Sequence, residues 1–403
     1  MKKLLLLSAA ASAVLMAGGD IAPVEPAVAA PAVETSGWDF SGQAVVYYQT
    51  SDSAGAADLF DQASSAADAG VQLRAVNKDI FNGVGAGVEV SGLTTLGLEH
   101  SVVSGVMEGF GGNLKGGWIS QAYLTYAMNN TSFKIGRQEL PKALSPFAFS
   151  EGWNVFKNTF DAALVVNTDI ADTTLVGAWV HAGNKYGDMA TFKHLNNNDG
   201  VYMLTAQNTA IENATLTGTY YYAPDAAAGE DIHILWGDAQ VKVGNYAVAA
   251  QAGTIMCDAL PDDGVAFGVK ASASFNGVNA NIAYSSTDEN ANFVNVGTGV
   301  KTPLYTQMIL NQGVIANDAD YIKVGASTKA LNGTIIANYG YAINNQDDIA
   351  GGADNNPAEF DLVYKTKVFN DSTTLLAAYV NVDPDVDGVD NTNVLRFWAR
   401  YNF

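Results

Sequence analysis

The sequence has little charge, and little of that charge is positive. Charged residues make up 15% of its 403 residues, against about 25% in ordinary globular domains, which argues against long solvent-exposed helices. Lys and Arg total 20 against 41 Asp and Glu, giving a net charge of −21. A nucleic acid is therefore not expected as a partner. The single cysteine, Cys257, excludes an internal disulfide and a cysteine-rich metal site.

Long apolar runs are also missing, except at the N-terminus. Met1-Lys2-Lys3 precedes an apolar run from Leu4 to Met16, and small residues follow at 17–19. This three-part pattern predicts a secretory signal peptide over 1–18, with later cleavage positions up to Ala30 as alternatives. The run is shorter than the roughly 20 residues that a transmembrane helix needs.

The Pro/Ala-rich stretch 19–37 predicts an extended tether between the signal peptide and the folded part of the chain. After the signal peptide, no apolar run is long enough for a transmembrane helix. If the exported chain enters a membrane, it must therefore do so as a barrel.

From residue 38 onward, hydrophobic and polar residues alternate with a period of two. In 264–275, for example, Val265, Phe267 and Val269 alternate with Ala266, Gly268 and Lys270. One face of 117–128 is expected to carry Trp118, Ala122, Leu124 and Tyr126. Such alternation is typical of strands with one apolar and one polar face. The runs predict about 18 strands, with about 16 as the second choice, over 38–50, 69–78, 81–95, 117–128, 131–140, 159–168, 173–182, 199–208, 213–223, 231–243, 245–254, 264–275, 278–287, 319–330, 333–343, 358–369, 372–382 and 391–403.

Short and long connections alternate along the chain. Short turns such as Asn276-Gly277 and Asn332-Gly333 suit tight hairpins, whereas the long connections are 51–68, 96–116, 141–158, 183–198, 288–318 and 344–357. This order predicts an all-β, antiparallel, up-and-down transmembrane β-barrel over 38–403, with short turns at one end and long loops at the other. The last strand ends on Phe403 and is expected to pair with the first, because an open sheet has a vulnerable edge.

The pattern resembles a bacterial outer-membrane porin. The segment from Lys134 to Leu140, followed by Pro141 and a loop to 159–162, resembles the third-loop region of the OprD-like porins, and the wider pattern is similar to the major outer-membrane porins of epsilonproteobacteria. The resemblance implies a bacterial outer-membrane location with a periplasmic tether, an 18-strand barrel and an inward-folded third loop, with a homotrimer as the common assembly. Departures are a long seventh loop (288–318) and short fifth, sixth and ninth loops.

Strand alternation also predicts which charges face the lumen. Lipid-facing positions of a barrel must be apolar, so charged residues within strands are expected to point inward. The predicted pore-lining cations are Arg74, Lys134, Arg137, Lys270, Lys323, Lys365, Arg396 and Arg400.

The third loop, about 141–158, is the predicted constriction. Four aromatic residues, from Phe147 to Phe156, could pack it against the inner wall. Its charged candidates, with the flanking residues, are Glu139, Lys142, Glu151, Lys157 and Asp161. Carboxylates facing wall cations would set ion preference at the narrowest point.

The function expected from these features is passive diffusion of ions and small hydrophilic solutes through a water-filled channel, with mild cation preference from the excess of acids. Membrane lipid, solutes and copies of the chain are the expected partners. The alternative is a structural or adhesive barrel that acts through its surface loops, and a soluble secreted β-protein is a third possibility. No enzyme is predicted, because His residues are scattered and no nucleophile-elbow motif occurs. No cofactor is expected.

One acidic segment leaves a metal alternative open. Asp383, Asp385, Asp387 and Gly388 match the start of a calcium loop, but Val394 stands where a bidentate Glu is expected. A solvated acidic loop is the preferred interpretation, and weak calcium binding is the alternative.

Overall fold

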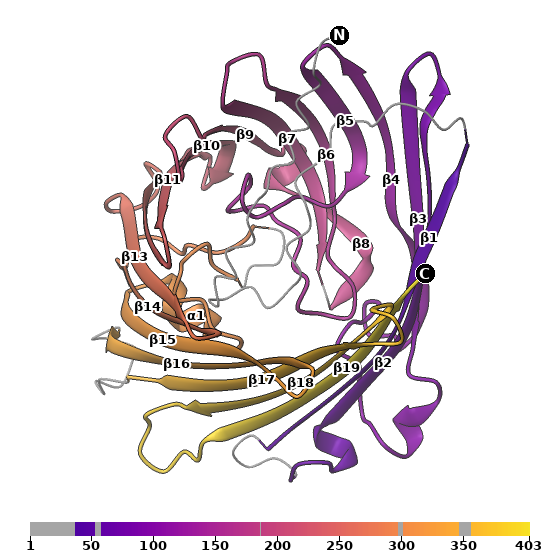
Figure 1. Cartoon of the computed structure of the whole chain (residues 1–403), viewed down its shortest axis with the longest axis vertical. Coiled ribbons are helices and arrows are strands. Elements are labelled where there is room, and N and C mark those ends of the chain that lie inside the picture. Colours follow the sequence, from indigo (N-terminus) through magenta and orange to yellow (C-terminus); the bar gives the residue numbers. More distant parts are fainter. Residues whose placement is uncertain (1–36, 53–57, 186, 297–300, 346–355) are drawn as a thin grey trace.

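The computed structural model describes residues 37–52, 58–185, 187–296, 301–345 and 356–403. The predicted signal peptide and the tether up to residue 36 lie outside the described residues. The chain forms a closed antiparallel barrel whose wall contains 18 strands (Figure 1). Within the described ranges, no helix is long and apolar enough to cross a membrane.

The elements follow the chain in order. The strands are β1 (Asp39–Ser51), β2 (Ser65–Phe81), β3 (Val84–Thr94), β4 (Gly116–Met128), β5 (Thr131–Gln138), β6 (Phe160–Asn167), β7 (Thr173–Lys185), β8 (Asp188–His194), β9 (Val201–Asn208), β10 (Ala214–Ala227), β11 (Glu230–Val243), β12 (Tyr246–Met256), β13 (Gly264–Phe275), β14 (Val278–Thr287), β15 (Ala319–Ala330), β16 (Gly333–Asn345), β17 (Ala358–Val368), β18 (Thr373–Asp383) and β19 (Thr392–Asn402). The short helices are η1 (Gln62–Ser64), η2 (Leu98–His100), η3 (Asn196–Asn198) and α1 (Gln312–Ala316).

The barrel closes between its first and last strands. β1 pairs with β19 from Gln43↔Asn402 to Ser51↔Val394. Beyond this ladder, Gly42 N donates to Phe403 O at 2.8 Å and Phe403 N donates to Gly42 O at 3.0 Å. The predicted closure and the predicted fold class are therefore confirmed.

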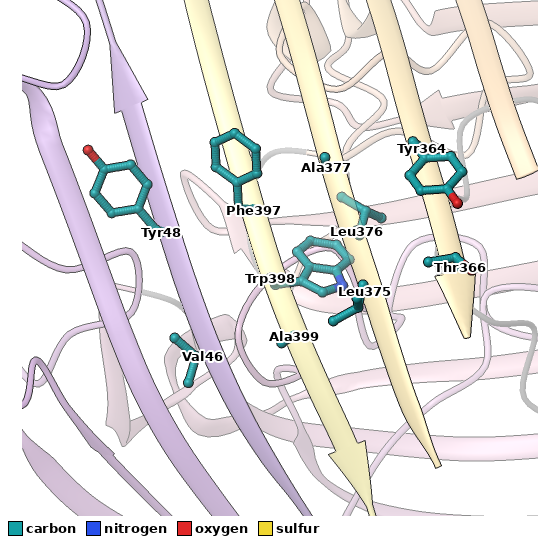
Figure 2. Close-up of a pocket in the computed structure, with 10 residues that line it drawn as sticks. All are labelled: Val46, Tyr48, Tyr364, Thr366, Leu375, Leu376, Ala377, Phe397, Trp398 and Ala399. Atoms are coloured by element: carbon teal, nitrogen blue, oxygen red, sulfur yellow. The ribbon is translucent and has the colours of Figure 1, made fainter. Parts of the chain in front are cut away.

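The outer face of the wall is apolar. On β13, Val265, Phe267 and Val269 are 43–49% exposed, whereas Lys270, which follows Val269 and points to the other face, is 6% exposed. Exposed apolar residues that alternate with buried polar ones are the pattern of a lipid-facing wall. Figure 2 shows a shallow apolar groove on β1 and β17–β19, where Ala377 and Ala399 lie among larger side chains.

One predicted face is wrong because β4 contains a bulge. The β3–β4 register passes from Glu89↔Gln121 to Val90↔Ile119, so Ser120 is the extra residue. An extra residue reverses the alternation beyond it. Trp118 consequently lies on the inner side and is buried, while Leu124 and Tyr126 stay on the outer face as expected.

β5 and β6 are shorter than the neighbouring β4, and another element covers the part of β4 that they leave unpaired. Both strands have eight residues, whereas β4 continues to Gly116. β8, which falls inside the predicted loop 183–198, forms a hairpin with the end of β7 and contacts β4. Met189 N donates to Gly109 O at 2.9 Å, and Phe110 bridges to Asp188. β8 therefore belongs to the loop region and not to the 18-strand wall.

Candidate functional site

The lumen holds two long loops, which we call L3 (139–159) and L7 (the described residues 288–296 and 301–318). Both lie inside the ring of strands (Figure 1). Charged side chains of the inner wall meet these loops in three groups, and each group joins segments of the chain that are distant in sequence. The geometry of these groups defines the candidate site.

The first group joins β2 and β3 to both ends of L3. Arg74 Nη2 lies 2.8 Å from Glu89 Oε2 and 3.7 Å from Glu139 Oε1. Lys157 Nζ lies 2.9 Å from Glu139 Oε2. Lys134 Nζ lies 3.9 Å from the ring centroid of Tyr123, whose hydroxyl is close to Arg74, Glu89 and Glu139. The structure thus brings together Arg74, Glu139 and Lys157, which the sequence placed at the wall and at the two ends of the loop.

The second group holds L7. Lys323 Nζ donates to Gln307 O at 2.6 Å, and Lys142 Nζ of L3 donates to Thr302 O at 3.0 Å. Lys270 Nζ lies 5.0 Å from the ring centroid of Tyr305. These three cations are therefore near one another through L7, a loop that was not predicted to enter the lumen.

The third group lies on β19. Arg396 donates to Gln49 Oε1 through Nε and Nη2, at 2.9 and 2.6 Å. Arg400 Nη1 donates to Gln43 Oε1 at 2.6 Å, and its Nη2 donates to the carbonyls of Asn154 and Val155 at 3.1 and 3.0 Å. The latter two bonds attach L3 to the wall. Lys365 on β17 shares the face of buried Val363 two positions earlier.

The aromatic side chains of L3 pack against strands on opposite sides of the lumen. Phe147 packs against Tyr221 and Trp236, with centroids 5.8 and 5.3 Å apart. On the other side, Trp153 lies 5.0 Å from Trp398 of β19. All four aromatic residues of the loop are at most 5% exposed. The loop therefore spans from β10 and β11 to β19.

L7 is the element that sequence reasoning missed. Glu359 of β17 accepts the N–H groups of Leu310 and Asn311 at 2.8 and 2.5 Å. Tyr305 donates its hydroxyl to Asp238 of β11. The length of the loop was noted in the sequence, and its apolar residues, such as Phe293 and Leu304, which are buried, were a signal that could have predicted its inward position. The polar anchors Glu359 and Asp238 lie on remote strands and could not be read from the loop.

Two candidates lie elsewhere. Arg137 is in register with Ala122 and Asp161, and Arg137 Nε lies 2.8 Å from Asp161 Oδ1. Its guanidinium also donates to Ile119 O at 2.9 Å and covers the ring of Phe192 at 3.2 Å. These contacts place Arg137 and Asp161 in the wall where β4 and β5 separate. They do not lie on the inner face with Lys134. Three positions separate Lys134 from Arg137, so strand alternation puts them on opposite faces.

The acidic segment after β18 does not gather its carboxylates. Asp385 N donates to Asp383 Oδ1 at 3.0 Å, and Asn356 N donates to Asp385 Oδ2 at 2.9 Å. In the part of the chain that the structure describes, no three His, Cys, Asp or Glu side chains lie close enough to hold a metal ion. The geometry thus offers no support for calcium binding by Asp383, Asp385 and Asp387.

Comparison with known proteins gives matches among solved structures. No protein-family model matches the sequence, and no curated protein sequence matches it. OccK9 (OpdG) of Pseudomonas aeruginosa is 14% identical, with a TM-score of 0.73 over 91% of this chain and 98% of that one. OpdK of the same organism, solved with vanillate, is 15% identical, with a TM-score of 0.72 over 91% and 98%. OccAB2 of Acinetobacter baumannii is 14% identical, with a TM-score of 0.73 over 92% and 99%.

The chain has the OprD-type porin fold. At such low identity the likeness is one of fold, and it covers nearly the whole of each matched structure. The resemblance seen in the sequence is confirmed at that level.

Proposed function

We propose that the protein is a bacterial outer-membrane porin. It forms a water-filled channel through which ions and small hydrophilic solutes diffuse passively. The observation that carries this proposal is a closed barrel with an apolar outer face and charged side chains on its inner face. A barrel of this size leaves a bore that its wall side chains alone do not fill. Catalysis of a reaction is not part of the proposal.

L3 and L7 form the proposed constriction. Glu139, Lys142, Glu151 and Lys157 are its charged residues on L3. The wall cations that face the lumen in this proposal are Arg74, Lys134, Lys270, Lys323, Lys365, Arg396 and Arg400. Support comes from the contacts that join both loops to charged wall residues. Such charges at a narrow point set ion preference.

A mild cation preference is the proposed selectivity. Over the whole chain, acidic residues outnumber basic ones by 41 to 20, and the resulting negative potential raises the concentration of cations around the channel. Several wall cations lie close to carboxylates, as Arg74 does to Glu89, so their effect on passing ions is partly offset. The reversal potential under a salt gradient measures this preference directly, and an anion-selective value would contradict it.

Liposome swelling tests the pore itself. Vesicles that contain the purified barrel should swell in small sugars, and the rate should fall as the sugar becomes larger, because the loops narrow the bore. Protein-free vesicles are the control. Swelling no faster than in the control, with the barrel shown to be folded, would favour the alternative of a structural or adhesive protein that acts through its surface loops.

Assembly as a homotrimer is also proposed, on the resemblance alone. Chemical cross-linking in the native membrane distinguishes a trimer from a monomer. Because each barrel closes on itself, we expect each copy to carry its own channel, and conductance should then appear in groups of three equal steps.

A further inference from the structure

Glu108 lies in the loop between β3 and β4, which we call L2 (95–115), and its side chain is completely buried. L2 is attached to β2 beside it. Ala67 N donates to Gly105 O at 3.2 Å, and Asp68 Oδ2 accepts the N–H groups of Met107 and Glu108 at 2.8 and 3.3 Å. These bonds fix the backbone from which the Glu108 side chain enters the barrel.

The carboxyl group of Glu108 binds L3. Its Oε1 accepts the N–H of Phe156 at 2.8 Å. The Phe156 ring packs against Trp118, with centroids 6.1 Å apart, and against the backbone of Gly70, where a Cβ would lie 2.7 Å from the ring. L2 and the wall therefore hold the same residue of L3 by its backbone and by its ring.

The surroundings of this carboxyl group satisfy it only in part. Among the described residues, none forms an ion pair with Glu108. Its Oε2 and Asp68 Oδ1 are buried oxygens without a hydrogen-bond partner. The groups that face it are Asp68 of β2, Tyr47 of β1 and Arg400 of β19, with Arg396 beyond Tyr47. Arg400 already donates to Gln43 and to two L3 carbonyls.

We propose that Glu108 is a proton-operated latch that holds L3 across the lumen when protonated and releases the 151–158 segment when ionised. Titration of this group would make the bore narrower at low pH and wider at high pH. The inference rests on the proposed function only for its effect on conductance. Docking of the loop is a separate observable.

The direction of the pH effect follows from the linkage between proton binding by Glu108 and docking of L3. Burial raises the pKa of Glu108 well above its usual range, and the charge of Asp68 adds to this, while the Phe156 N–H and Arg400 act in the opposite direction. The raised pKa means that Glu108 binds its proton more tightly when L3 is docked than when L3 is released. The docked state is thus favoured at low pH and loses that advantage as the pH rises through the raised pKa.

Hydrogen exchange of residues 151–158 tests the latch in the full barrel in lipid nanodiscs. After correction for intrinsic exchange, wild-type protection should fall between about pH 5 and about pH 9, by about tenfold for each pKa unit that docking adds. Glu108→Gln should keep the segment protected at both pH values, because its amide oxygen still accepts from Phe156 and cannot ionise. Glu108→Ala should lose protection at both.

Glu99→Gln is the matched control, because Glu99 lies in the same loop and hydrogen-bonds to Thr95 of that loop. It should behave as wild type. The latch is overturned if Glu108→Gln keeps the pH dependence of wild type, or if Glu108→Ala leaves the protection unchanged. Conductance recorded on the same samples separates the two ideas. A pH-dependent loop in a barrel that never conducts would reject the porin and keep the latch.

Discussion

L3 and L7 both lie in the lumen, but the chemistry that holds them there differs. L3 brings its own anchors, since the rings of Phe147 and Trp153 pack against aromatic residues of the wall. L7 also packs apolar side chains, such as Phe293 against Trp236, but it is held in addition by charged groups that the wall supplies, chiefly Glu359 and Lys323. Apolar packing contains no titratable group, whereas buried charged hydrogen bonds, including those of Glu359 to L7 and of Glu108 to L3, depend on every partner being present. The two loops should therefore respond to different perturbations.

Phe147→Ala should have the largest effect. The ring contacts Tyr221, Trp236 and Phe293, and removal of a buried Phe side chain costs about 3–5 kcal/mol. We expect L3 to detach near this point, with higher conductance and faster proteolysis of the loop. Limited proteolysis of the folded barrel measures this.

The matched control is Phe60→Ala, because Phe60 is an exposed ring outside the lumen. It should leave the proteolysis pattern of L3 unchanged. Equal rates for both variants would mean that the Phe147 ring does not hold the loop.

Glu359→Ala should come next and should act on L7 alone. It leaves the N–H groups of Leu310 and Asn311 without their acceptor, and for the buried N–H of Asn311 the loss costs about 1–3 kcal/mol. Hydrogen exchange at 304–311 should become faster while L3 stays protected. Glu289→Ala, at an exposed acid of the same loop, should change neither. If L3 and L7 loosened together, the two loops would be one unit and the comparison would fail.

A pair of Tyr→Phe variants should give the smallest effects. Tyr221→Phe removes the hydroxyl that accepts the Phe147 N–H at 3.1 Å, and Tyr305→Phe removes the hydroxyl that Tyr305 donates to Asp238. Each should cost about 1 kcal/mol in the free energy of unfolding. Loop exchange should change more in Tyr305→Phe, because the packed rings of L3 remain in place in Tyr221→Phe. The reverse order would contradict the assignment of apolar anchors to L3.

The fold could be predicted from the sequence because its signals are local. Alternation within each strand and Asn-Gly turns such as Asn276-Gly277, both with positive φ, depend on neighbouring residues only. Trp118 was misplaced because a bulge is set by cross-strand pairing at Ser120, which a single strand's pattern does not contain.

The site could be predicted only in part, because some of its contacts join residues that are distant in sequence. L3 carries apolar side chains in its own sequence, so its tendency to pack inward could be inferred. L7 also carries apolar side chains that are buried, such as Phe293, and these were overlooked. Its charged anchors Glu359 and Lys323 lie outside the loop, so the loop's own sequence does not contain them. Arg137 was assigned to the lumen because it lies next to the loop in sequence. Its spacing of three residues from Lys134 already favoured the face opposite to that of Lys134.

Single-channel recording in planar bilayers under a salt gradient tests the central claim most directly. A barrel whose bore is narrowed, but not filled, by L3 and L7 should give stepwise openings with a mildly cation-selective reversal potential, and Glu359→Ala should give larger steps. A folded barrel that inserts into the bilayer and gives no stepwise conductance, in wild type and in Glu359→Ala alike, would contradict the account.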